Sequence, residues 1–182
     1  MQSLRLSPEH MQNMVDHAVG VHPEEACGVI GGYAGCVEQI VLMDNVASEP
    51  CTRYELGANE QLKVLKAFEA QGLTWIGVYH SHPQGKPIPS PTDIAHAERH
   101  TPNLIHLIIG MKDQQVRLQA WHIHDGQVDE VQLLVGNQRG KPIKPLPRSQ
   151  IQAVVIATII GVTILFLIAL SLLPPSPELP LP

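Results

Sequence analysis

Apolar and polar positions alternate along residues 1–138 in a pattern that predicts both strands and helices. Short apolar runs that end at glycine, proline or asparagine indicate strands, and apolar residues three or four apart indicate helices. Two helices have typical starts, in which a serine cap precedes a proline: Ser7-Pro8 and Ser90-Pro91. The expected strands cover about 26–31, 37–43, 54–56, 73–82, 104–110, 116–124 and 127–135, and the expected helices about 8–19, 59–72 and 91–100. This order predicts an α/β domain in which helices flank a mixed, mostly antiparallel sheet.

A different pattern covers residues 151–173, where 23 consecutive residues carry no charge. A helix rises about 1.5 Å per residue, so this run is long enough to cross the ~30 Å hydrocarbon core of a bilayer. A very apolar core helix is the alternative, but the run is apolar all round and follows a basic, proline-rich linker at 139–150. We therefore predict a domain at 1–138, the linker, one transmembrane helix at 151–173 and a proline-rich tail at 174–182.

Charge is distributed unevenly along the chain. Residues 1–138 hold 8 Lys and Arg against 16 Asp and Glu, so the domain is net acidic and offers no basic patch for nucleic acid. Four basic residues precede the apolar run and none follows it; they are Arg139, Lys141, Lys144 and Arg148. The positive-inside rule then predicts a single-pass membrane protein whose domain faces the cytoplasm. The first residues contain no apolar segment of the signal-peptide kind.

The strongest chemical signal is a histidine pair followed by a serine and an aspartate, with the spacing H-x-H-x7-S-x2-D. Residues i and i+2 of a strand point to the same face, so His80 and His82 can hold one ion. If Ser90 caps the next helix, Asp93 lies in its first turn and can face back toward the strand end. Two imidazoles and a carboxylate are a ligand set of catalytic zinc sites, with the fourth position left to water. The alternative is a histidine-rich loop before a well-capped helix.

Hydrolysis at a zinc site also needs a group that takes a proton from water and delivers it to the leaving amine. One carboxylate can perform both steps. Glu25 is the candidate, because it directly precedes a short apolar, glycine-rich strand, and Glu24 is its neighbour.

These residues resemble the JAMM (MPN-plus, or Mov34/PAD-1) metallopeptidases over roughly residues 5–135. That family carries E-x-x-G upstream of H-x-H-x7-S-x2-D, and Glu25 to Gly28 match the first part. The resemblance implies a JAMM/MPN-like, cytidine-deaminase-like fold with one zinc ion held by His80, His82 and Asp93. It also implies that Glu25, rather than Glu24, is the general acid and base, and that Ser90 stabilises the oxyanion. The RadC-like branch shares part of the motif but matches less well upstream.

The same resemblance implies a substrate class. Small bacterial and archaeal members remove residues or partner proteins from the C-terminus of ubiquitin-like or sulfur-carrier proteins, often after Gly-Gly. We therefore expect zinc-dependent hydrolysis of a peptide or isopeptide bond at such a tail, by a membrane-anchored enzyme. Two alternatives are a metal-free, membrane-anchored scaffold of the MPN type and a peptidase acting on membrane-associated substrates without a ubiquitin-like partner.

Two further histidine pairs are weaker candidates. His96 and His100 are four residues apart on an expected helix, where a second metal site competes with a surface polar pair. His122 and His124 alternate in an expected strand and share one face, which favours exposure to solvent over metal binding.

Overall fold

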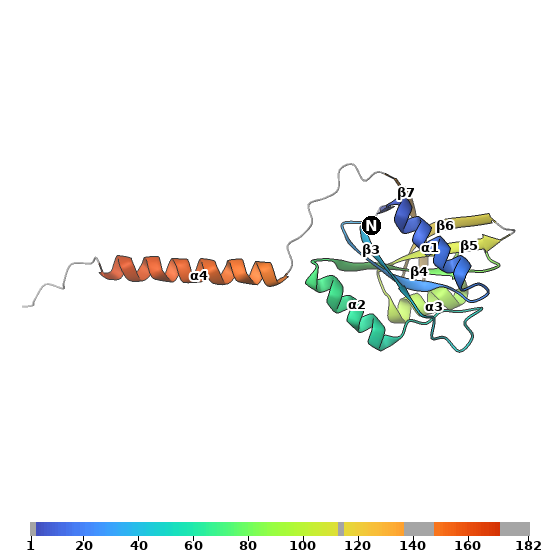
Figure 1. The fold of residues 1–182 in the computed structure, drawn as a ribbon, viewed down its shortest axis with the longest axis horizontal. Helices are drawn as coiled ribbons and strands as arrows, with labels where there is room; N and C mark the ends of the chain where they lie inside the picture. Colours follow the sequence, from blue (N-terminus) through green and yellow to red (C-terminus); the bar gives the residue numbers. More distant parts are fainter. Residues whose placement is uncertain (1–2, 113–114, 137–147, 172–182) are drawn as a thin grey trace, which may run out of the picture. The chain divides into compact units, whose positions relative to one another are not determined.

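Seven strands close into a barrel in the computed structural model, which describes residues 3–112, 115–136 and 148–171 (Figure 1). Around the barrel the strands follow the order β1-β3-β2-β4-β5-β6-β7. Their bounds are β1 Ser3–Leu6, β2 Cys27–Tyr33, β3 Cys36–Met43, β4 Thr74–His82, β5 Ile105–Lys112, β6 Gln115–His124 and β7 Gln127–Val135. The helices are α1 Pro8–Gly20, α2 Ala58–Ala70, α3 Pro91–His100 and α4 Arg148–Ser171.

The pairing pattern confirms the mixed, mostly antiparallel sheet. Four pairings are antiparallel, β2 with β3, β2 with β4, β5 with β6 and β6 with β7. Three are parallel, β4 with β5, β1 with β3 and β1 with β7. The pairing of β1 with β7 closes the barrel and was not predicted, since β1 has only four residues.

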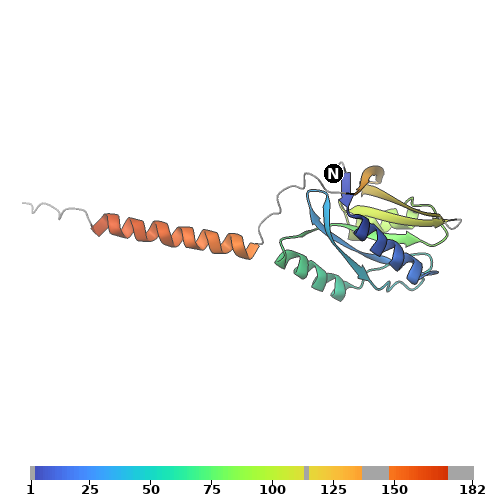
Figure 2. The same cartoon turned by 45° about the horizontal axis from the view of Figure 1, so that its top comes forward.

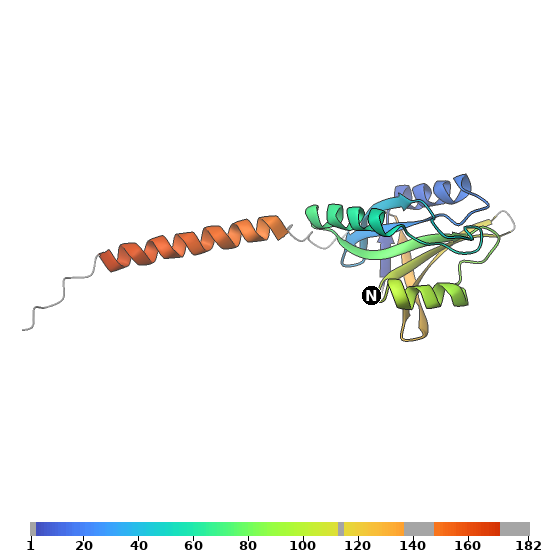
Figure 3. The same ribbon diagram turned by 90° about the horizontal axis from the view of Figure 1, so that it is seen from below.

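Helix α1 covers one side of the sheet (Figure 2). Its buried Met14 and Ala18 pack into a core cluster with Tyr79 and Leu107. Its N-terminus agrees with the sequence, because the side chain of Ser7 accepts a hydrogen bond from the backbone N–H of His10. Helix α3 lies apart from α1, with strands of the barrel between them (Figure 3). The sheet therefore places α3 next to the strand face that carries the candidate ligands.

Helix α2 packs on a second cluster, in which Phe68 meets Val29 and Val78. A Cβ atom at Gly31 would lie 2.6 Å from the ring of Phe68, so the glycine in β2 allows the close approach of this helix. The helix begins one residue earlier than expected, with Gly57 at the N-cap.

The expected strand at 54–56 was wrong, because this segment makes only a single bridge, between Asn45 and Leu56. The reason is local. The side chain of Asn45 donates to the carbonyl of Arg53 and accepts from the N–H of Glu55, at 3.0 Å each. These bonds replace the strand ladder that an extended segment would otherwise need.

The C-terminal helix α4 is a separate unit. Residues 150–169 are long and apolar enough to cross a membrane, with a mean hydropathy of 2.7, and none of this stretch is buried within the protein. Most of the predicted linker and the whole of the predicted tail at 174–182 lie outside the described residues.

Candidate metal centre

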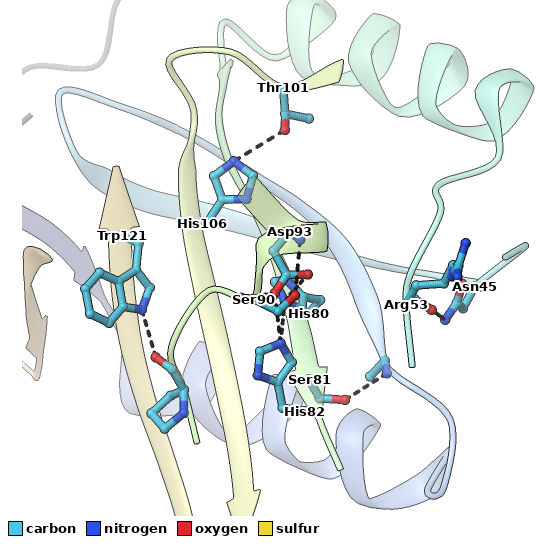
Figure 4. A network of polar contacts seen from close by, with 12 residues as sticks. Asn45, Arg53, His80, Ser81, His82, Ser90, Asp93, Thr101, His106 and Trp121 are labelled. Atoms are coloured by element: carbon cyan, nitrogen blue, oxygen red, sulfur yellow. Dashed lines mark hydrogen bonds and ion pairs between the residues drawn. The ribbon is translucent and has the colours of Figure 1, made fainter. Parts of the chain in front are cut away.

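The candidate ligands meet where β4 ends and α3 begins (Figure 4). Strand β4 runs to His82, so His80 and His82 project from the same face, as their spacing predicts. Ser81 lies between them and projects to the other face, where its hydroxyl accepts a 2.9 Å bond from the N–H of Ala26.

Three donor atoms converge at this point. Nε2 of His82 lies 3.1 Å from Nε2 of His80 and 3.2 Å from Oδ2 of Asp93. The second carboxylate oxygen of Asp93 lies 3.4 Å from Nε2 of His80. One ligand atom from each residue falls within 4.8 Å of the others, and no other group of this kind occurs among the described residues.

The first turn of α3 fixes the orientation of Asp93. Its side chain accepts a 2.7 Å bond from the backbone N–H of Ser90, and the hydroxyl of Ser90 accepts a 3.2 Å bond from the N–H of Asp93. The N-cap at Ser90 and the proline at the first helical position are as the sequence predicted, and the return bond from Asp93 makes them a reciprocal capping box. The cap that starts the helix therefore also aims the carboxylate at the two histidines.

The ring of His82 is held from its other side. Its Nδ1 lies 2.9 Å from the carbonyl of Lys86, so Nδ1–H donates there and Nε2 is the nitrogen that faces the centre. Lys86 belongs to residues 85–88, which we call the 85–88 segment. This segment is held against the sheet, because the indole N–H of Trp121 donates a 2.8 Å bond to the carbonyl of Pro87.

The protonation states of His80 and Asp93 suit a cation. Burial lowers the pKa of the fully buried His80, which keeps its imidazole neutral. Burial alone would raise the pKa of Asp93, but hydrogen bonds from His80 and His82 and from the N–H of Ser90 outweigh it and hold that pKa well below its usual range. A neutral imidazole and an ionised carboxylate are the forms that bind metal. Burial lowers the pKa of His82 as well, but hydrogen bonds with Asp93 and with the carbonyl of Lys86 outweigh it and raise that pKa, so metal binding there releases a proton. The donor set therefore fits a zinc ion.

Glu25 lies in the same pocket as His82 and Ser90, a cavity of about 480 Å³ that is also lined by Cys51. The side chain is 5% exposed, and its Oε2 has no hydrogen-bond partner within the described part of the chain. Burial raises the pKa of Glu25 from 4.5 to about 7; the charge of His82 lowers it and that of Asp93 raises it. A carboxyl group with a pKa near neutrality can accept and return a proton.

Asn45 is a positioning residue that the sequence did not reveal. Its amide donates to the carbonyl of Glu25 at 3.0 Å, and the N–H of Glu25 donates to the carbonyl of Pro50 at 2.7 Å. Ser81 also helps to hold this part of the backbone, since its N–H donates to the carbonyl of Ala26, the residue after Glu25, at 2.9 Å. A lone asparagine in a polar loop carries no signal that distinguishes this role.

Tyr54 is a second such residue. Its ring stacks on His80 with a centroid separation of 4.4 Å and an interplanar angle of 18°. The side chain is buried, and its hydroxyl has no hydrogen-bond partner among the residues that the structure describes. The aromatic ring therefore holds His80 through packing alone.

The weaker histidine candidates lie elsewhere. The rings of His96 and His100 are 4.7 Å apart on α3, and His96 also contacts Tyr54. His122 and His124 share one face of β6, where Nε2 of His124 lies 3.0 Å from a carboxylate oxygen of Asp129. Neither pair gathers a third ligand within the described ranges.

Comparison with known proteins gives a consistent result. A family model described as prokaryotic homologs of the JAB domain matches residues 7–124, which include every residue of the candidate centre. The chain is 37% identical over 124 residues to a desampylase of Haloferax volcanii, a match that covers 65% of this chain and 87% of that protein. It is also 37% identical over 120 residues to a CysO-cysteine peptidase of Mycobacterium tuberculosis, covering 64% and 80%. A solution structure of a Desulfitobacterium hafniense protein has a TM-score of 0.67 and 28% identity, covering 74% of this chain and 94% of that one.

Proposed function

Because the chain belongs to the prokaryotic homologs of the JAB domain and is a JAMM-type hydrolase, we propose that it cleaves a peptide or isopeptide bond in a zinc-dependent reaction. The substrate we propose is the C-terminal tail of a ubiquitin-like or sulfur-carrier protein. The observation that carries the proposal is the convergence of three donor atoms within 4.8 Å, in reach of a pocket that Glu25 and Ser90 also line.

In this proposal His80, His82 and Asp93 hold one zinc ion. When bound, the ion would lower the pKa of a water molecule and polarise the scissile carbonyl. Glu25 accepts the proton of the attacking water and then delivers it to the leaving amine. Its burial and its unpaired Oε2 support this role, because nothing else in the described residues competes for that oxygen. Ser90 has a hydroxyl hydrogen free to donate to the developing oxyanion, since its oxygen already serves as the helix cap.

The pocket supports a tail as substrate. A cavity of about 480 Å³ takes a few extended residues and not a folded domain. The relatives carry the names desampylase and CysO-cysteine peptidase, and the second name describes a bond between a protein and a single amino acid. A narrow protein tail satisfies both the pocket and these names.

We also propose that α4 anchors the enzyme in a membrane, with the hydrolase domain in the cytoplasm. The length and apolarity of residues 150–169 support the anchor, and the basic residues from Arg139 to Arg148 support the orientation. A membrane-impermeant maleimide tests the orientation, because Cys51 is exposed whereas Cys27 and Cys36 are buried. Labelling of Cys51 is expected only after intact cells are opened, and labelling of unopened cells would contradict the orientation.

The central experiment uses the full chain in a neutral detergent. About one zinc per chain is expected in the wild type and in Glu25→Gln, with loss of the metal in His82→Ala. His124→Ala is the matched control, since it removes a histidine outside the centre and should keep the ion. Cleavage of a fusion between a ubiquitin-like protein ending in Gly-Gly and a reporter should require Glu25. A fully active Glu25→Gln variant would end the assignment.

A further inference from the structure

A second cavity lies beside the candidate centre and has no part in the proposed reaction. It is a groove of about 860 Å³ over strands β5, β6 and β7, with the 85–88 segment as one edge. Gly85 lines both this groove and the pocket that contains Glu25. A polypeptide that reaches the centre can therefore continue into the groove without leaving the surface.

The groove carries the opposite charge to the rest of the domain. Residues 1–138 hold 8 basic residues against 16 acidic ones, yet three of those 8 line this groove: Lys86, Lys112 and Arg117. Of the lining residues that the structure describes, only Glu130 is acidic. A concave surface of one sign focuses its field and attracts a segment of the other sign.

The cations are arranged along one face of the β5–β6 hairpin. Arg117 pairs with Gly110, and Lys112 pairs with Gln115, so the two side chains project from the same face two positions apart. The guanidinium of Arg117 donates a 2.9 Å bond to the side chain of Gln115, which keeps it over the hairpin. The two charges therefore act together on whatever lies across these strands.

The edge of the groove is mechanically connected to the centre. The carbonyl of Lys86 holds the ring of His82, and Lys86 also lines the groove. The bond from Trp121 to Pro87 keeps this edge in place. A ligand in the groove thus lies within a few residues of the reacting bond, as expected for part of the substrate itself.

We propose that this groove binds an acidic segment of the substrate polypeptide next to the bond that is cleaved. The inference rests on the proposed function, in which the substrate is a polypeptide, and adds that this polypeptide is acidic next to the cleaved bond. Lys86, Lys112 and Arg117 recognise carboxylates, and the glutamines of the floor, Gln119 and Gln132, offer amide donors and acceptors to the backbone.

Binding of labelled peptides to the full-length Glu25→Gln protein in neutral detergent tests this proposal without turnover. The peptides share a central Gly-Gly and carry three glutamates or three lysines at the same positions on either side. At low salt we expect at least one glutamate peptide to bind about tenfold more tightly than its lysine counterpart, with the difference shrinking at high salt. Equal affinity for all peptides would overturn the proposal.

Charge reversal locates the effect. Lys112→Glu with Arg117→Glu should abolish or invert the preference for glutamate, whereas Lys63→Glu with Lys66→Glu, the same change on the exposed face of α2, should retain it. Loss of the preference in both double variants would also refute the groove as its origin. Thermal unfolding of both variants shows whether each is folded. The proposed function is tested separately, because it is refuted by the absence of cleavage by the wild type, whereas the groove is tested by peptide binding alone.

Discussion

Gly110→Ala adds a single methyl group at a position outside the candidate metal centre, and it should nevertheless disturb that centre. A Cβ atom at Gly110 would lie 2.5 Å from the backbone N of Pro87 and 2.8 Å from the carbonyl oxygen of Gly85. Ordinary contacts of this kind begin at 3.4 Å, and the neighbours here are backbone and a proline ring. The 85–88 segment must therefore withdraw, and its withdrawal pulls the carbonyl of Lys86 away from His82.

The magnitude has two parts. Overpacking against a backbone that is tied at Pro87 by Trp121 should lower the free energy of unfolding by about 2 kcal/mol. Loss of the carbonyl that orients His82 should weaken metal binding by roughly 10- to 100-fold, the usual effect of removing a partner of a metal ligand. Activity should fall together with metal occupancy.

Urea unfolding of the metal-free full-length chain in detergent measures the first part, with tryptophan fluorescence as the signal, since Trp121 contacts the displaced segment. Competition with a chelator measures the second. Gly20→Ala is the control, because the same methyl group at the end of α1 meets nothing within 4 Å and should change stability by less than about 1 kcal/mol. If Gly110→Ala keeps both wild-type stability and wild-type metal affinity, the 85–88 segment does not position His82.

Three further predictions concern buried groups. Ser81→Ala leaves the N–H of Ala26 without its acceptor and should destabilise the protein by about 1–2 kcal/mol in urea unfolding; an unchanged midpoint would mean that water replaces the hydroxyl. Tyr54→Phe keeps the ring on His80 and should retain the metal, whereas Tyr54→Ala should release it at lower chelator concentration; equal retention would exclude the stacking role. Burial lowers the pKa of His106 from 6.5 to about 3, so the unfolded chain binds the extra proton and stability falls as the pH drops below 6.5. Between pH 7 and pH 5 this group should remove about 2 kcal/mol, and His106→Gln should show a correspondingly flatter slope in unfolding experiments at both pH values.

The secondary structure was largely predictable because the sequence marks it locally. The caps at Ser7 and Ser90 are present as expected, and β4 ends at His82 as its histidine spacing requires. The segment at 54–56 has the alternation of a strand, but the N–H of Glu55 donates to the side chain of Asn45 and not to a neighbouring strand. This competition depends on a residue about ten positions earlier in the chain, so the alternation of apolar and polar residues does not reveal it.

The residues of the candidate centre also fall into two groups, those that the sequence predicted and those that it did not. The two histidines and Asp93 were brought together as expected, because their geometry depends on one strand end and one helix cap. The contributions of Tyr54 and Asn45 were missed, because each reaches the centre from the loop after β3 through contacts that no spacing encodes. The groove lined by Lys86, Lys112 and Arg117 was also not predicted. These cations are far apart in a net acidic sequence, so the charge of the domain does not reveal that they line one surface.

The parallel pairing of β1 with β7 has a consequence for synthesis. Ser3 pairs with Gln132 and Leu6 with Val135. Strand β1 therefore cannot pair with β7 until almost the whole domain has been synthesised. Contacts of such high sequence separation form late and slowly. The next apolar element to leave the ribosome is α4, which starts at Arg148, only a short stretch after β7. If α4 is the membrane anchor proposed above, barrel closure and delivery of the nascent chain to the membrane fall close together in time. An anchor inserted too early would hold an open sheet with β7 exposed along one edge.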